Sequence, residues 1–194
     1  LAAAAFSAAE AEPKRLTLAE AEALVRTGLK PSPDAGINPA LPFSLQEWKD
    51  EALWTRLRAQ VFRIIQNDWP QTTVIIHKGR VVPFGVSFGG LGVGSLCVTD
   101  LDSDKQPELV FTYAWGSGMH RAQLGIVRFA EALPKWESLG LTYLHGDLAL
   151  ERVSDQKVKV RQATVRWGAN LDKAADGATL VPGAELATIE YDAA

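Results

Sequence analysis

A series of short apolar runs, rich in β-branched and aromatic residues, occupies the chain from about residue 60 onward and constrains its fold more than any other feature. Each run is shorter than a typical globular helix, and turn-forming residues separate neighbouring runs, which is the pattern of antiparallel strands joined by turns. The stretches 77–80 and 154–156 have the turn chemistry of hairpins. The pattern predicts a β-meander with strands near 61–65, 73–76, 81–82, 95–99, 109–113, 124–129, 148–153 and 157–165. The alternative for the run at 61–65 is an extension of a preceding helix.

Two helical signals precede these runs. Thr17 and Glu20 have the spacing of a capping box, in which both side chains satisfy free backbone amides at a helix start, and a helix to about residue 26 follows. Ser44 and Glu47 repeat this spacing and predict a second helix that ends near Arg58. We therefore expect an α+β fold, with two short N-terminal helices packed on an antiparallel β-meander or small β-sandwich of about six to eight strands.

The length of 194 residues suits one hydrophobic core, so we expect a single globular domain at 17–192, preceded by a tail at 1–16. The first twelve residues, LAAAAFSAAEAE, carry an alanine-rich apolar run that turns acidic. One interpretation is the end of a secretory signal, which predicts a secreted or periplasmic protein. The other is an alanine-rich helical extension. Under this interpretation the chain is a cytosolic protein without a metal.

Charge and hydropathy narrow the classes of partner. The formal net charge is −3, and Lys and Arg are scattered along the chain, so we expect no nucleic-acid partner. No stretch is apolar over the roughly 18 residues that a membrane span requires, so we expect no membrane span. The partner that we expect is an unknown protein or glycan ligand. Cys97 is the sole cysteine, which excludes an internal disulfide.

An acidic stretch between two predicted strands carries the most specific chemistry in the chain. Alternate residues place oxygen donors at Asp100, Asp102, Asp104, Gln106 and Glu108. If the chain curls tightly, these donors converge, and Ca²⁺ takes six to eight oxygen ligands of this kind. The stretch therefore predicts a calcium site made of four carboxylates and the backbone carbonyl of Gln106. The alternative is a solvated acidic turn held by Asx-type hydrogen bonds.

The acidic loop is not an EF-hand. An EF-hand requires glycine at the sixth loop position, where Lys105 stands, and a bidentate glutamate at the twelfth, where Phe111 stands. The flanking segments are also predicted strands instead of helices.

Residues 88–113, FGGLGVGSLCVTDLDSDKQPELVFTY, resemble a single FG-GAP repeat of integrin-like β-propellers. The matching positions are the Phe88-Gly89 pair, the acidic residues of the loop and the exit strand that begins at Leu109. Lys105 replaces the usual glycine and Glu108 the usual aspartate. In that family the loop binds calcium and stiffens the strand junction, so the resemblance implies a calcium-stabilised loop. A lone copy does not build the several blades of a propeller.

A second group of residues with binding chemistry follows soon after the acidic loop. Trp115, His120 and Arg121 combine an aromatic ring, an imidazole and a guanidinium around a glycine-containing turn, which suits an anionic or sugar ligand. The alternative is a plain hairpin loop.

Two functions follow from these observations. The first is an extracytoplasmic, non-enzymatic binding or structural module with a calcium-stabilised loop. The second is a secreted hydrolase whose site combines the Trp115 group with the acidic loop as metal ligand or general acid and base. The second function requires one concave pocket that holds both groups.

Overall fold

The computed structural model describes residues 14–30, 37–86, 90–116, 119–129, 133–166 and 179–190. These residues form two short helices and 11 strands, and the strands make three antiparallel sheets. The helices are α1 (Leu18–Gly28) and α2 (Glu51–Leu57). Residues 1–13 of the predicted tail, the Phe88-Gly89 pair and the predicted domain end at 191–192 lie outside the described residues.

The three sheets follow one another along the chain. The first has the order β1-β2-β3-β4, with strands Ser44–Glu47, Ala59–Gln66, Trp69–His77 and Arg80–Val86. The second has the order β5-β6-β7-β8, with strands Gly92–Thr99, Glu108–Trp115, Arg121–Arg128 and Lys135–Tyr143. The third has the order β11-β10-β9, with strands Thr179–Glu190, Lys157–Arg166 and Asp147–Arg152.

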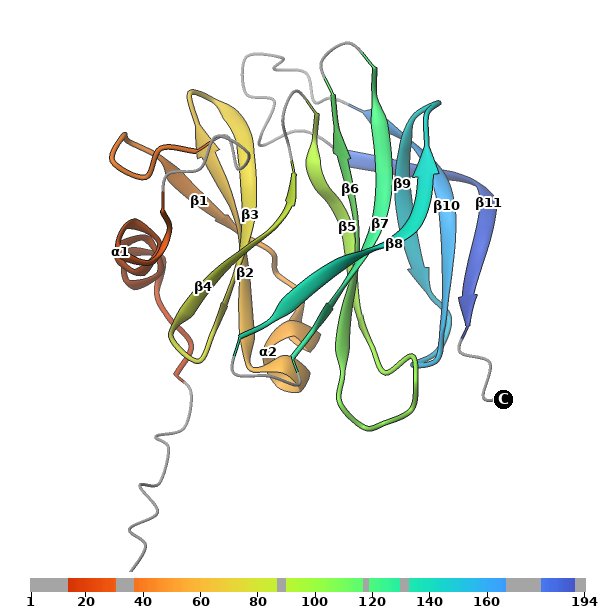
Figure 1. Cartoon of the computed structure of the whole chain (residues 1–194), viewed down its shortest axis with the longest axis horizontal. Coiled ribbons are helices and arrows are strands. Elements are labelled where there is room, and N and C mark those ends of the chain that lie inside the picture. The colour runs from red at the N-terminus through yellow and green to blue at the C-terminus, as the bar shows by residue number, and fades with distance from the viewer. Residues whose placement is uncertain are drawn as a thin grey trace, which may run out of the picture.

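The second sheet lies between the other two (Figure 1). One of its faces shares a buried cluster with the first sheet, in which Phe84 contacts Phe111 edge-on with ring centroids 4.8 Å apart. Its other face shares a buried cluster with Leu148, Val158 and Val160 of the third sheet. The central sheet is therefore apolar on both faces.

Strand β6 shows how the sequence specifies this arrangement. Successive side chains of a strand point to opposite faces. In β6, Leu109 and Phe111 enter the cluster with the first sheet, while Val110 and Ala114 enter the cluster with the third. A strand that is buried on both faces needs a nearly continuous apolar run instead of an alternating one. The run that begins at Leu109 meets this need.

The predicted α+β class is wrong, because the protein is mostly β. The 11 strands exceed the six to eight expected, they form three sheets, and the two helices do not make a layer of their own. The first capping box is present: the side chains of Thr17 and Glu20 each accept from the other residue's backbone amide at the start of α1. The predicted second helix is replaced over its first four residues by β1, which pairs with β2.

Helix α2 begins later than the sequence predicts and is only seven residues long. Its N-cap is Asp50, whose side chain accepts from the backbone amide of Ala52 at 2.9 Å. It ends at Leu57, and its C-cap residue Arg58 adopts the left-handed conformation with φ of 50°. The chain then enters β2, which confirms the predicted strand at 61–65.

Candidate metal centre

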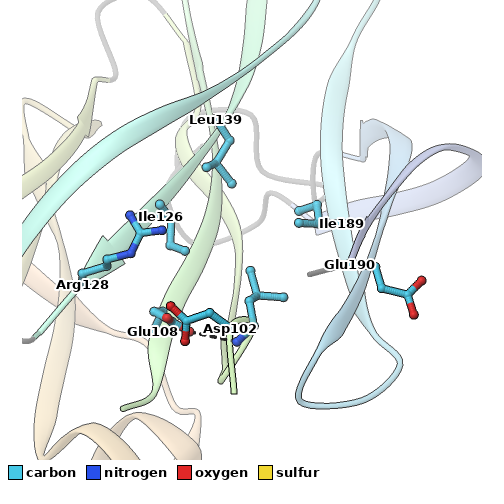
Figure 2. Close-up of a pocket in the computed structure, with 8 residues that line it drawn as sticks. Asp102, Glu108, Ile126, Arg128, Leu139, Ile189 and Glu190 are labelled. Carbon is cyan, nitrogen blue, oxygen red and sulfur yellow. Dashed lines mark hydrogen bonds between the residues drawn. The ribbon is translucent and has the colours of Figure 1, made fainter. Parts of the chain in front are cut away.

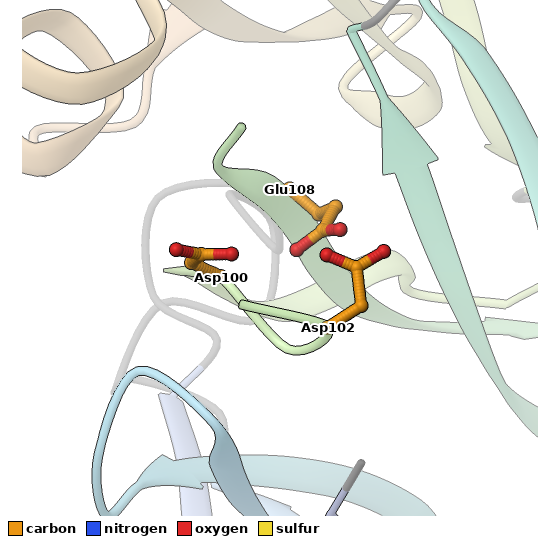
Figure 3. A group of neighbouring side chains, drawn as sticks. All are labelled: Asp100, Asp102 and Glu108. Atoms are coloured by element: carbon orange, nitrogen blue, oxygen red, sulfur yellow. The ribbon is translucent and has the colours of Figure 1, made fainter. Parts of the chain in front are cut away.

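Three carboxylates converge at the loop that joins β5 to β6. One carboxylate oxygen from each of Asp100, Asp102 and Glu108 lies within 4.8 Å of those from the other two (Figure 3). Asp100 follows the last residue of β5, Asp102 lies in the turn, and Glu108 is the first residue of β6. The two aspartates are half-buried, whereas Glu108 is only 4% exposed.

The curl of the loop brings these carboxylates together. Ser103 and Lys105 adopt left-handed conformations, with φ of 58° and 69°. The backbone amide of Asp104 donates to Asp102 Oδ1 at 3.3 Å, and that of Gln106 donates to Asp104 Oδ1 at 2.7 Å. The Asx-type turns of the alternative interpretation are thus present in the same loop as the convergent carboxylates.

Of the four predicted carboxylate ligands, the structure brings three together. Asp104 and Gln106 are exposed, and Asp104 is not a member of the convergent group. Asp104 instead holds the turn through its bond with the amide of Gln106. The spacing of one residue therefore predicts a loop in which three carboxylates converge, but the fourth carboxylate, that of Asp104, lies outside the group.

Burial and like charge both act on Glu108. Its Oε2 accepts from the backbone amide of Leu101 at 3.0 Å. Burial raises the pKa of the Glu108 carboxyl above its ordinary value, and the charges of Asp102 and Asp104 raise it further. The bond from Leu101 and the charge of Arg128 oppose this rise in pKa without cancelling it. The ionised group of carboxylates is therefore costly without a compensating cation.

Two oxygens beside the group have no hydrogen-bond partner among the described residues. They are Asp100 Oδ1 and Thr99 Oγ1, and both atoms are buried. Thr99 is 0% exposed and lies directly opposite Glu108 in the β5–β6 ladder, on the same face of the sheet. Buried polar atoms in folded proteins normally have a partner, so these two oxygens are available to bind a ligand or an ion.

The loop is anchored by elements distant in sequence. The backbone amide of Asp100 donates to the carbonyl oxygen of Asp155, in the β9–β10 turn, at 3.0 Å. The side chain of Asp155 accepts from Arg56 of α2 at 2.6 Å, and Arg56 also donates to the carbonyl oxygen of Val98 at 3.3 Å. Two distant segments, α2 and the β9–β10 turn, therefore fix the start of the acidic loop.

A pocket of about 180 Å³ adjoins the carboxylate group. Figure 2 shows Asp102 and Glu108 at one end of it, below Leu139 and Ile126. Leu101 of the β5–β6 loop and Arg128 of β7 complete the wall on this side, and Ile189 and Glu190 of β11 form the opposite wall. The pocket is thus apolar except at its charged end and rim. Residues of the third sheet carry no local signal for this role, and sequence reasoning missed them.

The second predicted group forms two separate pairs, Trp115 with Arg121 and His120 with Asp147. Trp115 and Arg121 are paired across β6 and β7, and the guanidinium carbon of Arg121 lies 5.2 Å from the Trp115 ring centroid. His120 Nε2 lies 3.1 Å from Asp147 Oδ1. Asp147 is 7% exposed, and burial raises its pKa while His120 lowers it. Sequence reasoning did not place Asp147 here, because 27 residues separate it from His120.

The structure does not bring the two predicted groups into one place. Glu108 is the first residue of β6 and Trp115 is the last. Seven steps of about 3.4 Å separate them by roughly 24 Å along the strand. The pocket beside the acidic loop is not lined by Trp115, His120 or Arg121.

Comparison of this chain with protein-family models, with curated proteins and with solved structures finds no match in any of the three. Among the residues that the structure describes, neither helix has the length and apolar character that crossing a membrane would demand. The carboxylate group and its surroundings therefore provide the basis for a functional proposal.

Proposed function

We propose that this protein is a non-enzymatic binding or structural module in which a calcium ion, held by Asp100, Asp102 and Glu108, stabilises the β5–β6 loop. The observation that carries the proposal is the convergence of these three carboxylates within 4.8 Å, one of them buried. The FG-GAP-like pattern of the loop supports the same proposal. Lys105, which replaces the glycine of that pattern, adopts the left-handed conformation that glycine adopts most readily.

The spacing of the oxygens suits calcium. With Ca²⁺–O distances of about 2.3–2.6 Å, two ligands on opposite sides of the ion lie roughly 5 Å apart. Two ligands on opposite sides of Mg²⁺ lie roughly 4 Å apart. A group of oxygens spread over as much as 4.8 Å therefore accommodates Ca²⁺ with little adjustment. Within the group, Asp100 Oδ1 has no hydrogen-bond partner among the described residues and is available to a cation.

A cation also removes an electrostatic penalty. Two carboxylates about 4.8 Å apart repel by roughly 3 to 4 kcal/mol at an effective dielectric near 20. Without a cation this repulsion favours protonation of Glu108, whose pKa burial has already raised. A bound divalent ion compensates both effects and links the ends of β5 and β6.

The proposed role places the module outside the cytoplasm. Calcium sites of extracellular modules bind with dissociation constants of about 10⁻⁴ to 10⁻³ M, so they are occupied where calcium is abundant. The N-terminal alanine-rich run supports this location through its signal-like pattern. The alternative hydrolase requires one pocket that holds both groups, and the Trp115 group does not line the pocket at the acidic loop.

The test is a thermal melt in EDTA and in calcium, with two charge-matched variants. Calcium at a hundredfold excess over its dissociation constant should stabilise the wild type by about 2.7 kcal/mol. Asp102→Asn should lose this gain. Asp104→Asn removes the same charge from outside the convergent group and keeps the carbonyl that holds the turn, so it should retain most of the gain. An unresponsive wild type, or equal losses in the two variants, would contradict the proposal.

A further inference from the structure

We propose that the pocket beside the carboxylate group binds a small amphiphilic carboxylate, whose head completes the coordination of the calcium ion and whose apolar chain lies along the pocket. This inference rests on the proposed calcium site. It adds a ligand class and a binding function to a loop that would otherwise serve only stability.

The first argument is the overlap between the pocket and the carboxylate group. Asp102 and Glu108 belong to both, so an ion bound between them lies at the end of the pocket. The walls next to that end are the apolar side chains of Ile126, Leu139 and Ile189 (Figure 2). A ligand that fits this arrangement has a polar head and an apolar body.

The second argument is the number of ligands. The three side chains offer six carboxylate oxygens, and two of these already accept backbone amides, at Asp102 Oδ1 and Glu108 Oε2. Calcium takes six to eight oxygens, so the protein side chains leave coordination positions open. An oxygen donor that enters through the pocket can fill one or two of them.

The third argument is independent of the carboxylates' own geometry. The hydroxyl of Thr99 is buried, has no partner among the described residues, and lies on the same sheet face as Glu108 and directly opposite it. A buried hydroxyl left in this state opposite Glu108, which itself lines the pocket, indicates that a ligand completes its surroundings.

The size and charge of the pocket define the ligand further. A volume of about 180 Å³ corresponds to roughly six water molecules at about 30 Å³ each, which suits a short alkyl chain. Arg128 contributes a positive charge to the wall, although Glu137 shares that charge in an ion pair. Lys157 likewise neutralises Glu190 on the opposite wall. The head of the ligand therefore meets the ion as its main source of positive charge.

The experiment is a calorimetric titration of the whole chain with hexanoate, in saturating calcium and again in EDTA. Hexanoate should bind in calcium and should not bind in EDTA. Hexylamine, which has the same chain with a cationic head, should not bind in EDTA. Binding of hexylamine under that condition would show that the carboxylates recognise an organic cation directly, and this result would overturn the inference.

Two matched leucine variants test the apolar wall. Leu139 lines the pocket and is 37% exposed, whereas Leu144 is 50% exposed and does not line it. Leu139→Ser should weaken hexanoate binding at least tenfold and leave the calcium-induced rise in melting temperature unchanged. Leu144→Ser should change neither. Equal hexanoate affinity in the two variants would overturn the inference.

The outcomes separate the two proposals. If calcium raises the melting temperature but hexanoate gives no binding heat, the ligand inference fails and the calcium site stands. If calcium has no effect on the melt or in a direct calcium titration, both proposals fail.

Discussion

Glu108 combines deep burial with close carboxylate neighbours. Because burial raises the pKa of the Glu108 carboxyl in the folded protein, protonation of this group stabilises the folded state. This stabilisation is fully present below the pKa that Glu108 has in the unfolded state. It is lost as pH rises through the pKa that Glu108 has in the folded state. In EDTA, the free energy of unfolding should therefore fall as pH rises from below the ordinary glutamate pKa to the raised value. Glu108→Gln should remove this part of the pH dependence, measured by urea unfolding at a series of pH values. Identical pH profiles for the two proteins would contradict this account of Glu108.

Lys105 combines two separable features, a left-handed backbone that costs stability and a positive charge that opposes calcium binding. Lys105→Gly removes both, and Lys105→Gln removes only the charge. In EDTA the glycine variant should be more stable than the glutamine variant by about 1 kcal/mol, because left-handed conformations strain residues with a Cβ atom. Both variants should bind calcium more tightly than the wild type. Equal stability of the two variants in urea unfolding would show that the left-handed backbone costs little here.

At the scale of the element, Phe111 and Gly125 form a cross-strand pair in the centre of the second sheet. A Cβ atom added at Gly125 would lie 2.5 Å from Cζ of the Phe111 ring, so the ring occupies the space that a side chain would need. Gly125→Ala should destabilise the protein by about 1–3 kcal/mol through overpacking. Introducing Phe111→Leu alongside it should cost less than the sum of the two single changes, as chemical denaturation can measure. Strict additivity would argue against the clash.

The elements also show where sequence patterns succeed. Lys78 and Gly79 form the predicted turn with positive φ, and the turn at Ser154 joins β9 to β10 as expected. These features depend on a few adjacent residues. The helix predicted from the capping-box spacing at Ser44 does not begin there. Backbone pairing with β2 is a long-range interaction, and it overrides the local helix signal.

At the scale of the whole molecule, the second sheet couples two cores. Its faces pack against the first and third sheets, and Thr112 Oγ1 donates to the carbonyl oxygen of Leu148 at 2.8 Å across the second interface. We expect the three sheets to unfold in a single cooperative transition. Tryptophan fluorescence and far-ultraviolet circular dichroism should give the same urea midpoint. Distinct midpoints would show that one sheet unfolds independently.

The same long-range packing explains how much of the site the sequence could predict. Asp100, Asp102 and Glu108 are close in sequence, and their spacing predicted a common loop. Thr99 lies opposite Glu108 because of the sheet register, and Ile189 lines the adjoining pocket because of the packing of the third sheet. The number and order of sheets likewise depend on which apolar faces meet, and the strand patterns do not encode that choice locally.

The most direct test of the central claim is the anomalous scattering of a crystal grown in calcium. We expect one peak between the carboxylates of Asp100, Asp102 and Glu108, at about 2.3–2.6 Å from an oxygen of each. The peak should disappear in a crystal of Asp102→Asn grown under the same conditions. A well-ordered loop with no peak at these three residues, or with the ion bound elsewhere, would contradict the calcium site.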